Sequence, residues 1–175
     1  GVQTCALPIY LPELKEVDIQ KGVTKIGKEA FAYCNKLSRI NMPDTVKSIG
    51  TDAVWCGYYW SDSSHAYFCK IHAPYGSYAV TYAKKNNISY ACNISDASVT
   101  GIKKTYTYTG SDIKPVPTVT LGKAKLSGIN DYHVTYRNNK KAGTATLKII
   151  GDNHFYGTIT LNFQITPAAT PKPQT

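Results

Sequence analysis

The side chains that could carry out catalysis are few and scattered in this sequence. The four histidines are His65, His72, His133 and His154. None of them stands in a known nucleophile motif with a serine, a cysteine or an acid, and neither G-x-S-x-G, H-E-x-x-H nor a glycine-rich phosphate loop is present. The three glutamates fit solvated surface positions better than a paired acid–base set. We therefore expect a protein that is not an enzyme and that uses no cofactor.

The cysteines are not spaced as metal ligands. No C-x-x-C pair exists and no histidine lies at zinc-ligand spacing, so we expect no metal site. Cys56 and Cys69 bracket 12 residues. A disulfide between them in an oxidising compartment is one interpretation, and two thiols is the other.

An aromatic segment between these two cysteines supplies the first candidate binding residues. They are Tyr58, Tyr59, Trp60, His65 and Tyr67. Large rings among serines offer contact area at a small entropic cost, as recognition loops do. The alternative is that the rings pack over neighbouring apolar surface.

A repeat of 23 residues predicts the scaffold that carries this segment. Eight positions recur at that spacing. Among them, Leu14, Val17, Ile19, Gly27 and Phe31 of the first unit correspond to Leu37, Ile40, Met42, Gly50 and Val54 of the second. A fixed period of this kind predicts a solenoid, in which short strands stack and each glycine forms a corner. Outward strand positions are further candidates for binding: Lys15, Asp18 and Arg39.

The two units are LKEVDIQKGVTKIGKEAFAYC (14–34) and LSRINMPDTVKSIGTDAV (37–54). They resemble the BspA-type leucine-rich repeats of bacterial surface proteins. The second unit departs from the pattern, because Val54 replaces a phenylalanine and Cys56 comes one position early. The resemblance implies an extracellular place, at the cell surface or in the wall, and binding to a surface or matrix protein or glycan of a host or neighbouring cell.

The segment after the aromatic residues predicts closure of the repeats. Cys69–His72 should form a last strand, Ser77 should cap a helix over 78–86 with Ala79, Tyr82 and Ala83 facing inward, and 88–91 should return as a strand. The segment GSYAVTYAKKN (76–86) also resembles the terminal segment of BspA-type arrays. At the other end of the repeats, we expect Val17, Ile19 and Phe31 to be partly uncovered.

From about residue 97 the apolar period becomes two, with turn residues between short runs. This pattern predicts a small antiparallel β-sandwich. The motifs YTG (108–110), DYHVTYRNN (131–139) and AGTA (142–145) resemble those of immunoglobulin-like modules that occur in tandem in bacterial surface proteins. The resemblance implies that this part of the chain acts as a stalk and carries no catalytic residues. The last stretch, 168–175, is a Pro/Thr-rich linker.

The net charge of +9 is unevenly spread. Residues 94–175 carry ten Lys and Arg against four Asp, and 10–93 carry ten against seven acids. The basic residues stand singly or in short pairs, so we expect no nucleic-acid partner and a solvated surface suited to an anionic cell envelope. No apolar run approaches the roughly 20 residues of a transmembrane segment.

The predicted organisation has four parts. Residues 1–9 resemble a translated sequencing adapter and are set aside; 10–93 hold the BspA-type repeats with a helical cap; 94–167 hold the immunoglobulin-like sandwich; and 168–175 the linker. The expected fold is mostly β, and the expected function is protein binding and adhesion with the sandwich as a stalk. The alternatives are a passive spacer of a secreted wall hydrolase or glycosidase, or a carbohydrate-binding module.

Overall fold

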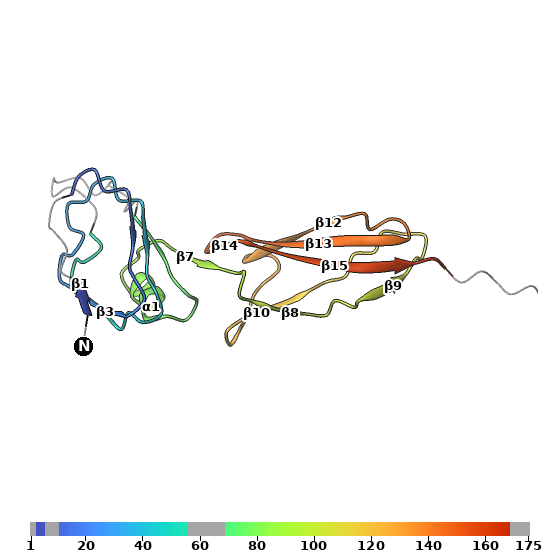
Figure 1. Ribbon diagram of the computed structural model, residues 1–175, viewed down its shortest axis with the longest axis horizontal. Helices are drawn as coiled ribbons and strands as arrows, with labels where there is room; N and C mark the ends of the chain where they lie inside the picture. Colours follow the sequence, from blue (N-terminus) through green and yellow to red (C-terminus); the bar gives the residue numbers. More distant parts are fainter. Residues whose placement is uncertain (1–2, 6–10, 56–68, 169–175) are drawn as a thin grey trace, which may run out of the picture. The chain divides into compact units, whose positions relative to one another are not determined.

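The computed structural model describes residues 3–5, 11–55 and 69–168 (Figure 1). The chain divides into two compact units, unit 1 (Gly1–Asn93) and unit 2 (Ile94–Thr175). The described residues are mostly β, with one short helix. Among them, no helix has the length and apolar character needed to span a membrane.

Unit 1 contains two sheets of parallel strands. The first has the order β2 (Glu16–Asp18), β4 (Arg39–Asn41), β6 (Lys70–His72), β7 (Tyr90–Asn93). The second has the order β1 (Gln3–Cys5), β3 (Val23–Ile26), β5 (Ser48–Ile49). Val17 pairs with Ile40 and Ile26 with Ile49, so residues 23 apart in the sequence are neighbours in both sheets. The sequence period is therefore the register of the structure.

The recurring apolar residues form the core of unit 1. Its most deeply buried members include Ile26, Phe31, Leu37, Ile40, Val46, Val54 and Ile71. The expectation that Phe31 would be partly uncovered was wrong, since only 1% of it is exposed. The backbone N–H of Phe31 donates to the Ala53 carbonyl at 2.9 Å, so the second repeat lies directly against it. Ile19 is also buried, and Val17 is half-buried.

Helix α1 (Tyr78–Lys85) begins where the sequence predicts. The Ser77 hydroxyl accepts a hydrogen bond from the N–H of Val80 at 3.4 Å, as an N-cap does. The buried residues of the helix are Ala79, Val80 and Ala83. Tyr82, predicted to face inward, is instead only half-buried. The return strand β7 begins at Tyr90, two residues later than predicted.

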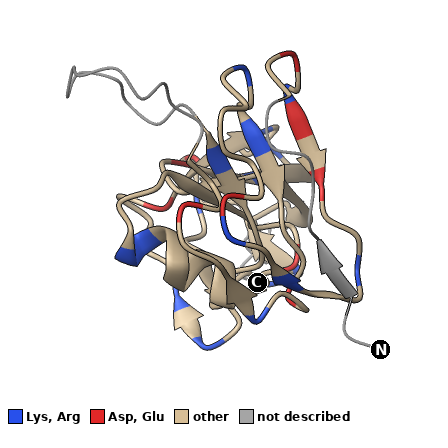
Figure 2. Cartoon of the chain, turned by 90° about the vertical axis from the view of Figure 1, so that its left-hand side faces the viewer, with Lys and Arg blue, Asp and Glu red and all other residues tan. Residues whose placement is uncertain are grey.

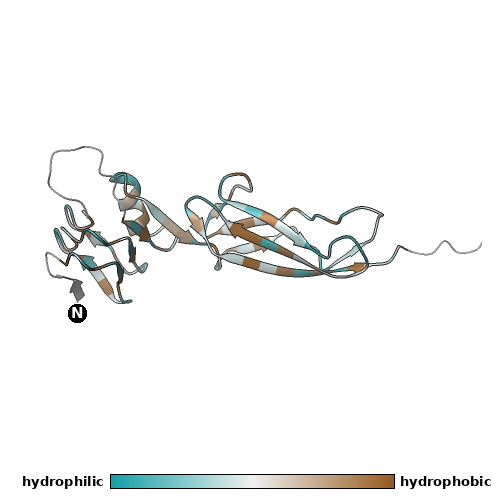
Figure 3. Ribbon diagram, turned by 90° about the horizontal axis from the view of Figure 1, so that it is seen from above, coloured by the Kyte–Doolittle hydropathy of each residue, from teal (hydrophilic) through white to brown (hydrophobic). Residues whose placement is uncertain are grey.

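Unit 2 contains a four-stranded and a three-stranded sheet. The first has the order β12 (Tyr132–Arg137), β13 (Gly143–Gly151), β15 (Thr158–Thr166), β9 (Thr105–Thr107). The second has the order β11 (Ala124–Lys125), β10 (Thr118–Leu121), β8 (Ser98–Thr100), and β14 (Phe155–Tyr156) is a further short strand. Apolar and polar residues alternate along the long strands (Figure 3). Hence Ala145, Leu147 and Ile149 are buried while Lys148 is exposed.

One strand of unit 2 departs from the expected antiparallel arrangement. β9 pairs with β15 in parallel, with Tyr106 opposite Ile165. A parallel pair requires a long connection, and the chain between these strands runs through most of the unit, which supplies one.

Tyrosines join the four-stranded sheet to the segment that leads into β10. The hydroxyls of Tyr132 and Tyr136 donate to the carbonyls of Pro117 and Pro115 at 3.2 and 2.7 Å. Burial raises the pKa of both phenols, with a smaller contribution from Asp131 at Tyr132 and from the neighbouring tyrosines at Tyr136. Both groups therefore remain protonated donors at neutral pH.

Candidate functional site

The aromatic candidates lie outside the described residues. This holds for Tyr58, Tyr59, Trp60, His65 and Tyr67, and also for Cys56. Cys69 is described and fully buried, beside the first residue of β6. The disulfide between Cys56 and Cys69 therefore stays a prediction.

The outward face of the first sheet of unit 1 carries two rows of polar side chains. One row is Glu16, Arg39 and Lys70, and the other is Asp18, Asn41 and His72. Between them runs the row that faces the core, in which Ile40 and Ile71 are completely buried. Because successive side chains of a strand point to opposite faces, each strand contributes its first and third residue to this surface.

The charges on this face are ordered from strand to strand. Glu16 and Asp18 lie on β2, whereas Arg39 and Lys70 lie on β4 and β6, and Figure 2 shows the acidic strand beside the two basic ones. An Arg39 Nη2 lies 2.5 Å from Glu16 Oε2, and the Asn41 amide donates to the Asp18 carboxylate. These exposed pairs contribute about 0–1 kcal/mol each, so their main effect is to order the side chains.

A further pair continues the same arrangement just before the strands. The ammonium group of Lys36 donates to both carboxylate oxygens of Glu13 at 2.8 Å. This pair, like Glu16–Arg39 and Asp18–Asn41, joins residues 23 apart. An acid in the first repeat therefore meets a donor at the equivalent position of the second.

His72 ends the second polar row and is the last residue of β6. Burial lowers the pKa of its imidazole, and the positive charges of Arg39 and Lys70 lower it further, while Glu16 opposes them. His72 is therefore neutral at pH 7, and the positive charge of the face comes from Arg39 and Lys70.

Two of the three predicted outward residues lie on this face. Asp18 and Arg39 are strand residues with outward side chains. Lys15 is exposed but precedes β2, and its carbonyl accepts bonds from the N–H and hydroxyl of Ser38 at 2.8 and 3.0 Å. The prediction missed Glu16, Asn41, Lys70 and His72. The 23-residue spacing from Glu16 to Arg39 was the signal that would have found the first of these.

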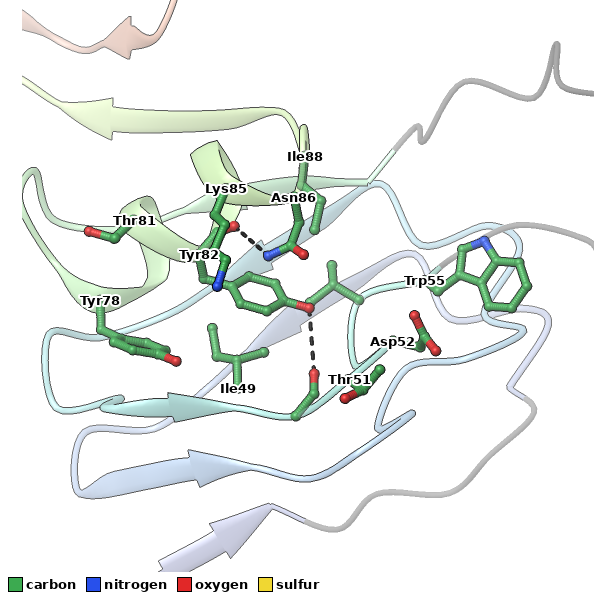
Figure 4. Close-up of a pocket in the computed structure, with 12 residues that line it drawn as sticks. Ile49, Thr51, Asp52, Trp55, Tyr78, Thr81, Tyr82, Lys85, Asn86 and Ile88 are labelled. Carbon is green, nitrogen blue, oxygen red and sulfur yellow. Dashed lines mark hydrogen bonds between the residues drawn. The ribbon is translucent and has the colours of Figure 1, made fainter.

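A pocket of about 520 Å³ lies between the second repeat and α1 (Figure 4). Buried Ile49, Val54 and Ile88 contribute apolar side chains. The polar groups come from two sides: Thr51 and Asp52 from the repeat, and Thr81, Lys85 and Asn86 from α1 and its end. Trp55, Tyr78 and Tyr82 add aromatic rings.

The pocket occupies the place where the return segment of a further repeat would stack. In the first repeat, the N–H groups of Glu29 and Phe31 donate to carbonyls of the return segment of the second repeat. The equivalent residues of the second repeat, Asp52 and Val54, line the pocket. Tyr82 crosses this space, and its hydroxyl makes a long contact of 3.5 Å with the Gly50 carbonyl. The helix therefore covers the repeat incompletely and leaves a mixed polar and aromatic hollow.

The comparisons with known proteins concern unit 1. Residues 10–60 match the family model described as "BspA type Leucine rich repeat region (6 copies)". This match supports the resemblance of the two repeats and points to a bacterial surface protein involved in protein interactions. No curated protein and no solved structure matches the chain. The immunoglobulin-like resemblance and the adapter interpretation stay predictions, although residues 3–5 form β1 and pair with β3.

No group of three or more His, Cys, Asp or Glu side chains comes together within the described ranges as metal ligands would. His133 and Asp152 in unit 2 do meet, with Nδ1 at 2.8 Å from the carboxylate. Both side chains are substantially exposed, and the pair links β12 to the end of β13. We interpret it as a surface contact.

Proposed function

We propose that this chain is a non-enzymatic part of a secreted or wall-attached bacterial surface protein. Unit 1 is a short solenoid end closed by α1, and it binds a surface or matrix protein of a host or neighbouring cell. Unit 2 is an immunoglobulin-like β-sandwich that acts as a stalk. The match of residues 10–60 to BspA-type repeats is the observation that supports this proposal most directly.

The outward face of β2, β4 and β6 is the surface proposed for protein binding. Its strands keep strict register, so its side chains are held on a rigid sheet. The acidic first strand beside two basic strands gives the face a charge pattern that a complementary partner can match. A passive spacer needs no such pattern, and it would bind nothing through this face.

Removing the positive charges of this face tests the proposal. The Arg39→Gln, Lys70→Gln double variant should weaken binding to extracellular-matrix proteins or epithelial cells by about tenfold or more, ~1.4 kcal/mol, because it deletes the charged donors that face the partner. Binding can be measured by surface plasmon resonance and cell-adhesion assays.

The matched control removes two positive charges from the other sheet. Lys25 lies on β3 and Lys47 just before β5, and both are exposed. The Lys25→Gln, Lys47→Gln variant should bind as the parent chain does. Equal losses in both variants would mean that net charge alone matters, and a parent chain that binds no such target would favour the spacer.

Carbohydrate binding is the second candidate function, and the pocket beside α1 favours it. Its volume lies within the range of small-ligand sites, and it combines rings with hydroxyl, amide and carboxylate groups. The opposite charges of Asp52 and Lys85 fit a neutral, hydroxyl-rich ligand such as a sugar.

A glycan array tests this second candidate. The parent chain should retain a defined set of glycans, and Trp55→Ala should weaken them by about tenfold or more, as loss of an aromatic hot spot does. Tyr156→Ala, which removes an exposed ring in unit 2, is the control. A blank array, or equal losses in both variants, would exclude the pocket as a glycan site.

A further inference from the structure

The charges of unit 2 are segregated along its strands. The described part of the unit holds nine Lys and Arg and four Asp. Six basic residues lie on or beside three segments that meet at the end of the sheet where the turn between β12 and β13 lies, and we call this group the basic end: Lys103, Lys104, Lys114, Arg137, Lys140 and Lys141. Asp112 is the only described acid beside them.

Strand register brings the basic end together from three segments. Gly143 at the start of β13 pairs with Ile165, which pairs in turn with Tyr106 of β9. The carbonyl of Lys104 accepts from Gln164 N–H at 2.9 Å. Ile113 and Asn139 exchange two hydrogen bonds, at 2.9 and 3.1 Å, and this fixes the segment of Lys114 against the turn.

The other three acids lie at the opposite end of the unit. Asp152 N–H donates to the Asp131 carbonyl, beside the pair formed by Tyr132 and Gly151. Asp96 is two residues after Ile94, and the N–H of Ile94 donates to the Tyr156 carbonyl, which places Asp96 near the same end. β13 runs from one end to the other and its nine residues span roughly 27 Å. This exceeds the Debye length of about 8 Å at physiological salt, so these acids do not neutralise the basic end.

The basic end is incompletely neutralised, and three of its residues, Arg137, Lys140 and Lys141, line a hollow. Residues 136–144 line a depression of about 620 Å³. Asp112 lies 3.3 Å from Lys114 and 3.8 Å from Lys140, so one carboxylate serves two ammonium groups. Within the described residues, Arg137 and Lys141 form no ion pair. The turn itself is anchored, because Asn139 is 6% exposed and bonded to Ile113.

We propose that the basic end binds a linear polymer, other than a nucleic acid, that carries repeated anionic groups. Cations spread over three segments suit an extended polyanion better than a single small anion, since each contact releases counterions. Arg137 can bind two oxygens of one phosphate, sulfate or carboxylate group, and the lysines act as point charges.

Nucleic acid fits this surface less well than the other polyanions do. Tyr106 packs edge-on against Phe163 at 5.2 Å and the Tyr136 hydroxyl is bonded to Pro115, so neither ring is placed to stack on a base.

Polyphosphate, heparin and poly-glutamate are the probes, since they present phosphate, sulfate and carboxylate groups. Fluorescence anisotropy of labelled polymers with the full chain, from about 50 to 200 mM salt, should show affinity that falls steeply with salt, with a log–log slope of about −4 to −5 if all six cations take part. Preference among the three probes identifies the anionic group.

The test variant is Arg137→Gln, Lys140→Gln, Lys141→Gln, and the control is Lys123→Gln, Lys125→Gln, Lys148→Gln. Both remove three exposed positive charges from unit 2, but only the first removes them from the basic end. The first should lose at least tenfold in affinity and reduce the slope by about 2–3, and the control should change affinity by less than about twofold.

Three results would overturn the proposal. They are equal losses in the two variants, which would leave only a net-charge effect; no binding of any of the three polymers by the parent chain; and binding of duplex DNA in preference to all three. An unchanged thermal unfolding curve for both variants is required for the comparison, and we expect one because all six substituted side chains are exposed.

Discussion

Replacing Phe163 with alanine should destabilise unit 2 by about 3–5 kcal/mol, the usual cost of removing a large ring from a packed core. Phe163 is 1% exposed, lies on β15, an interior strand of the four-stranded sheet, and pairs with buried Ala145 on β13. Its ring also meets Tyr106 edge-to-face, with the ring centroids 5.2 Å apart, and the alanine variant loses this contact. Urea unfolding of the full chain, followed by far-UV circular dichroism, measures the loss.

The distribution of tryptophan makes this experiment specific to one unit. Both tryptophans, Trp55 and Trp60, belong to unit 1. Tryptophan fluorescence therefore follows unit 1 alone, and it should not change in Phe163→Ala if the two units unfold independently. Thr160→Ala, an exposed position on the same strand, should stay within about 0.5 kcal/mol of the parent chain. A fluorescence transition that moves with Phe163→Ala would show that the units unfold together.

The sequence predicted the arrangement of unit 1 well because one constraint determines it. Repeated apolar slots at a fixed spacing must stack to be buried, and this alone gives the pairing of Val17 with Ile40 and of Ile26 with Ile49. The cap helix was also predictable, since its start depends on a local signal, the Ser77 hydroxyl. A local capping signal and a strict apolar period both determine structure without reference to distant segments, so they can be recognised in the sequence alone.

The candidate site was harder to predict because it depends on how separate segments meet. The pocket is formed by residues 49–55 and 78–88, and nothing in either stretch alone indicates a hollow between them. The position of Tyr82 illustrates the difficulty. Helical spacing placed it on the inward face with Ala79 and Ala83. The third buried residue of the helix is instead Val80, and the half-buried ring of Tyr82 lies across the pocket. Tyr82 therefore stands at the edge of the buried face, where helical spacing alone does not settle which side of the boundary a residue takes.

The parallel pairing of β9 with β15 was missed for a similar reason. In β9 the half-buried Tyr106 lies between two exposed threonines and packs against Phe163, the alternation that is typical of a strand at the core. Alternation has no direction, however, so it cannot distinguish a parallel from an antiparallel partner. Within the four-stranded sheet, β9 comes first in the chain and β15 last, and the pairing of two such distant segments is not recorded in either one.

Replacing Gly50 with alanine should destabilise unit 1 by about 2–3 kcal/mol, in the upper part of the range for an overpacked core. A Cβ atom at this position would lie 2.5 Å from the backbone N of Lys28 and 2.8 Å from the carbonyl carbon of Gly27. Both atoms belong to the backbone of the preceding repeat, so no side chain can rotate away. The corner also carries the hydrogen bond from Gly50 N–H to the Ile26 carbonyl at 3.0 Å, which would lengthen as the two repeats separate.

Tryptophan fluorescence during thermal unfolding measures this loss, and we expect a fall in Tm of roughly 10–20 °C for a unit of this size. Gly76→Ala is the matched control. Gly76 has a φ of +77° but no atom within 4 Å of an added Cβ, so its replacement should cost only the conformational strain, about 1–2 kcal/mol. A Gly50→Ala variant as stable as Gly76→Ala would contradict the close stacking of the two corners. A clear excess for Gly50 would mean that this glycine is required because the backbone of the preceding repeat passes directly over it, and that backbone conformation is not the reason.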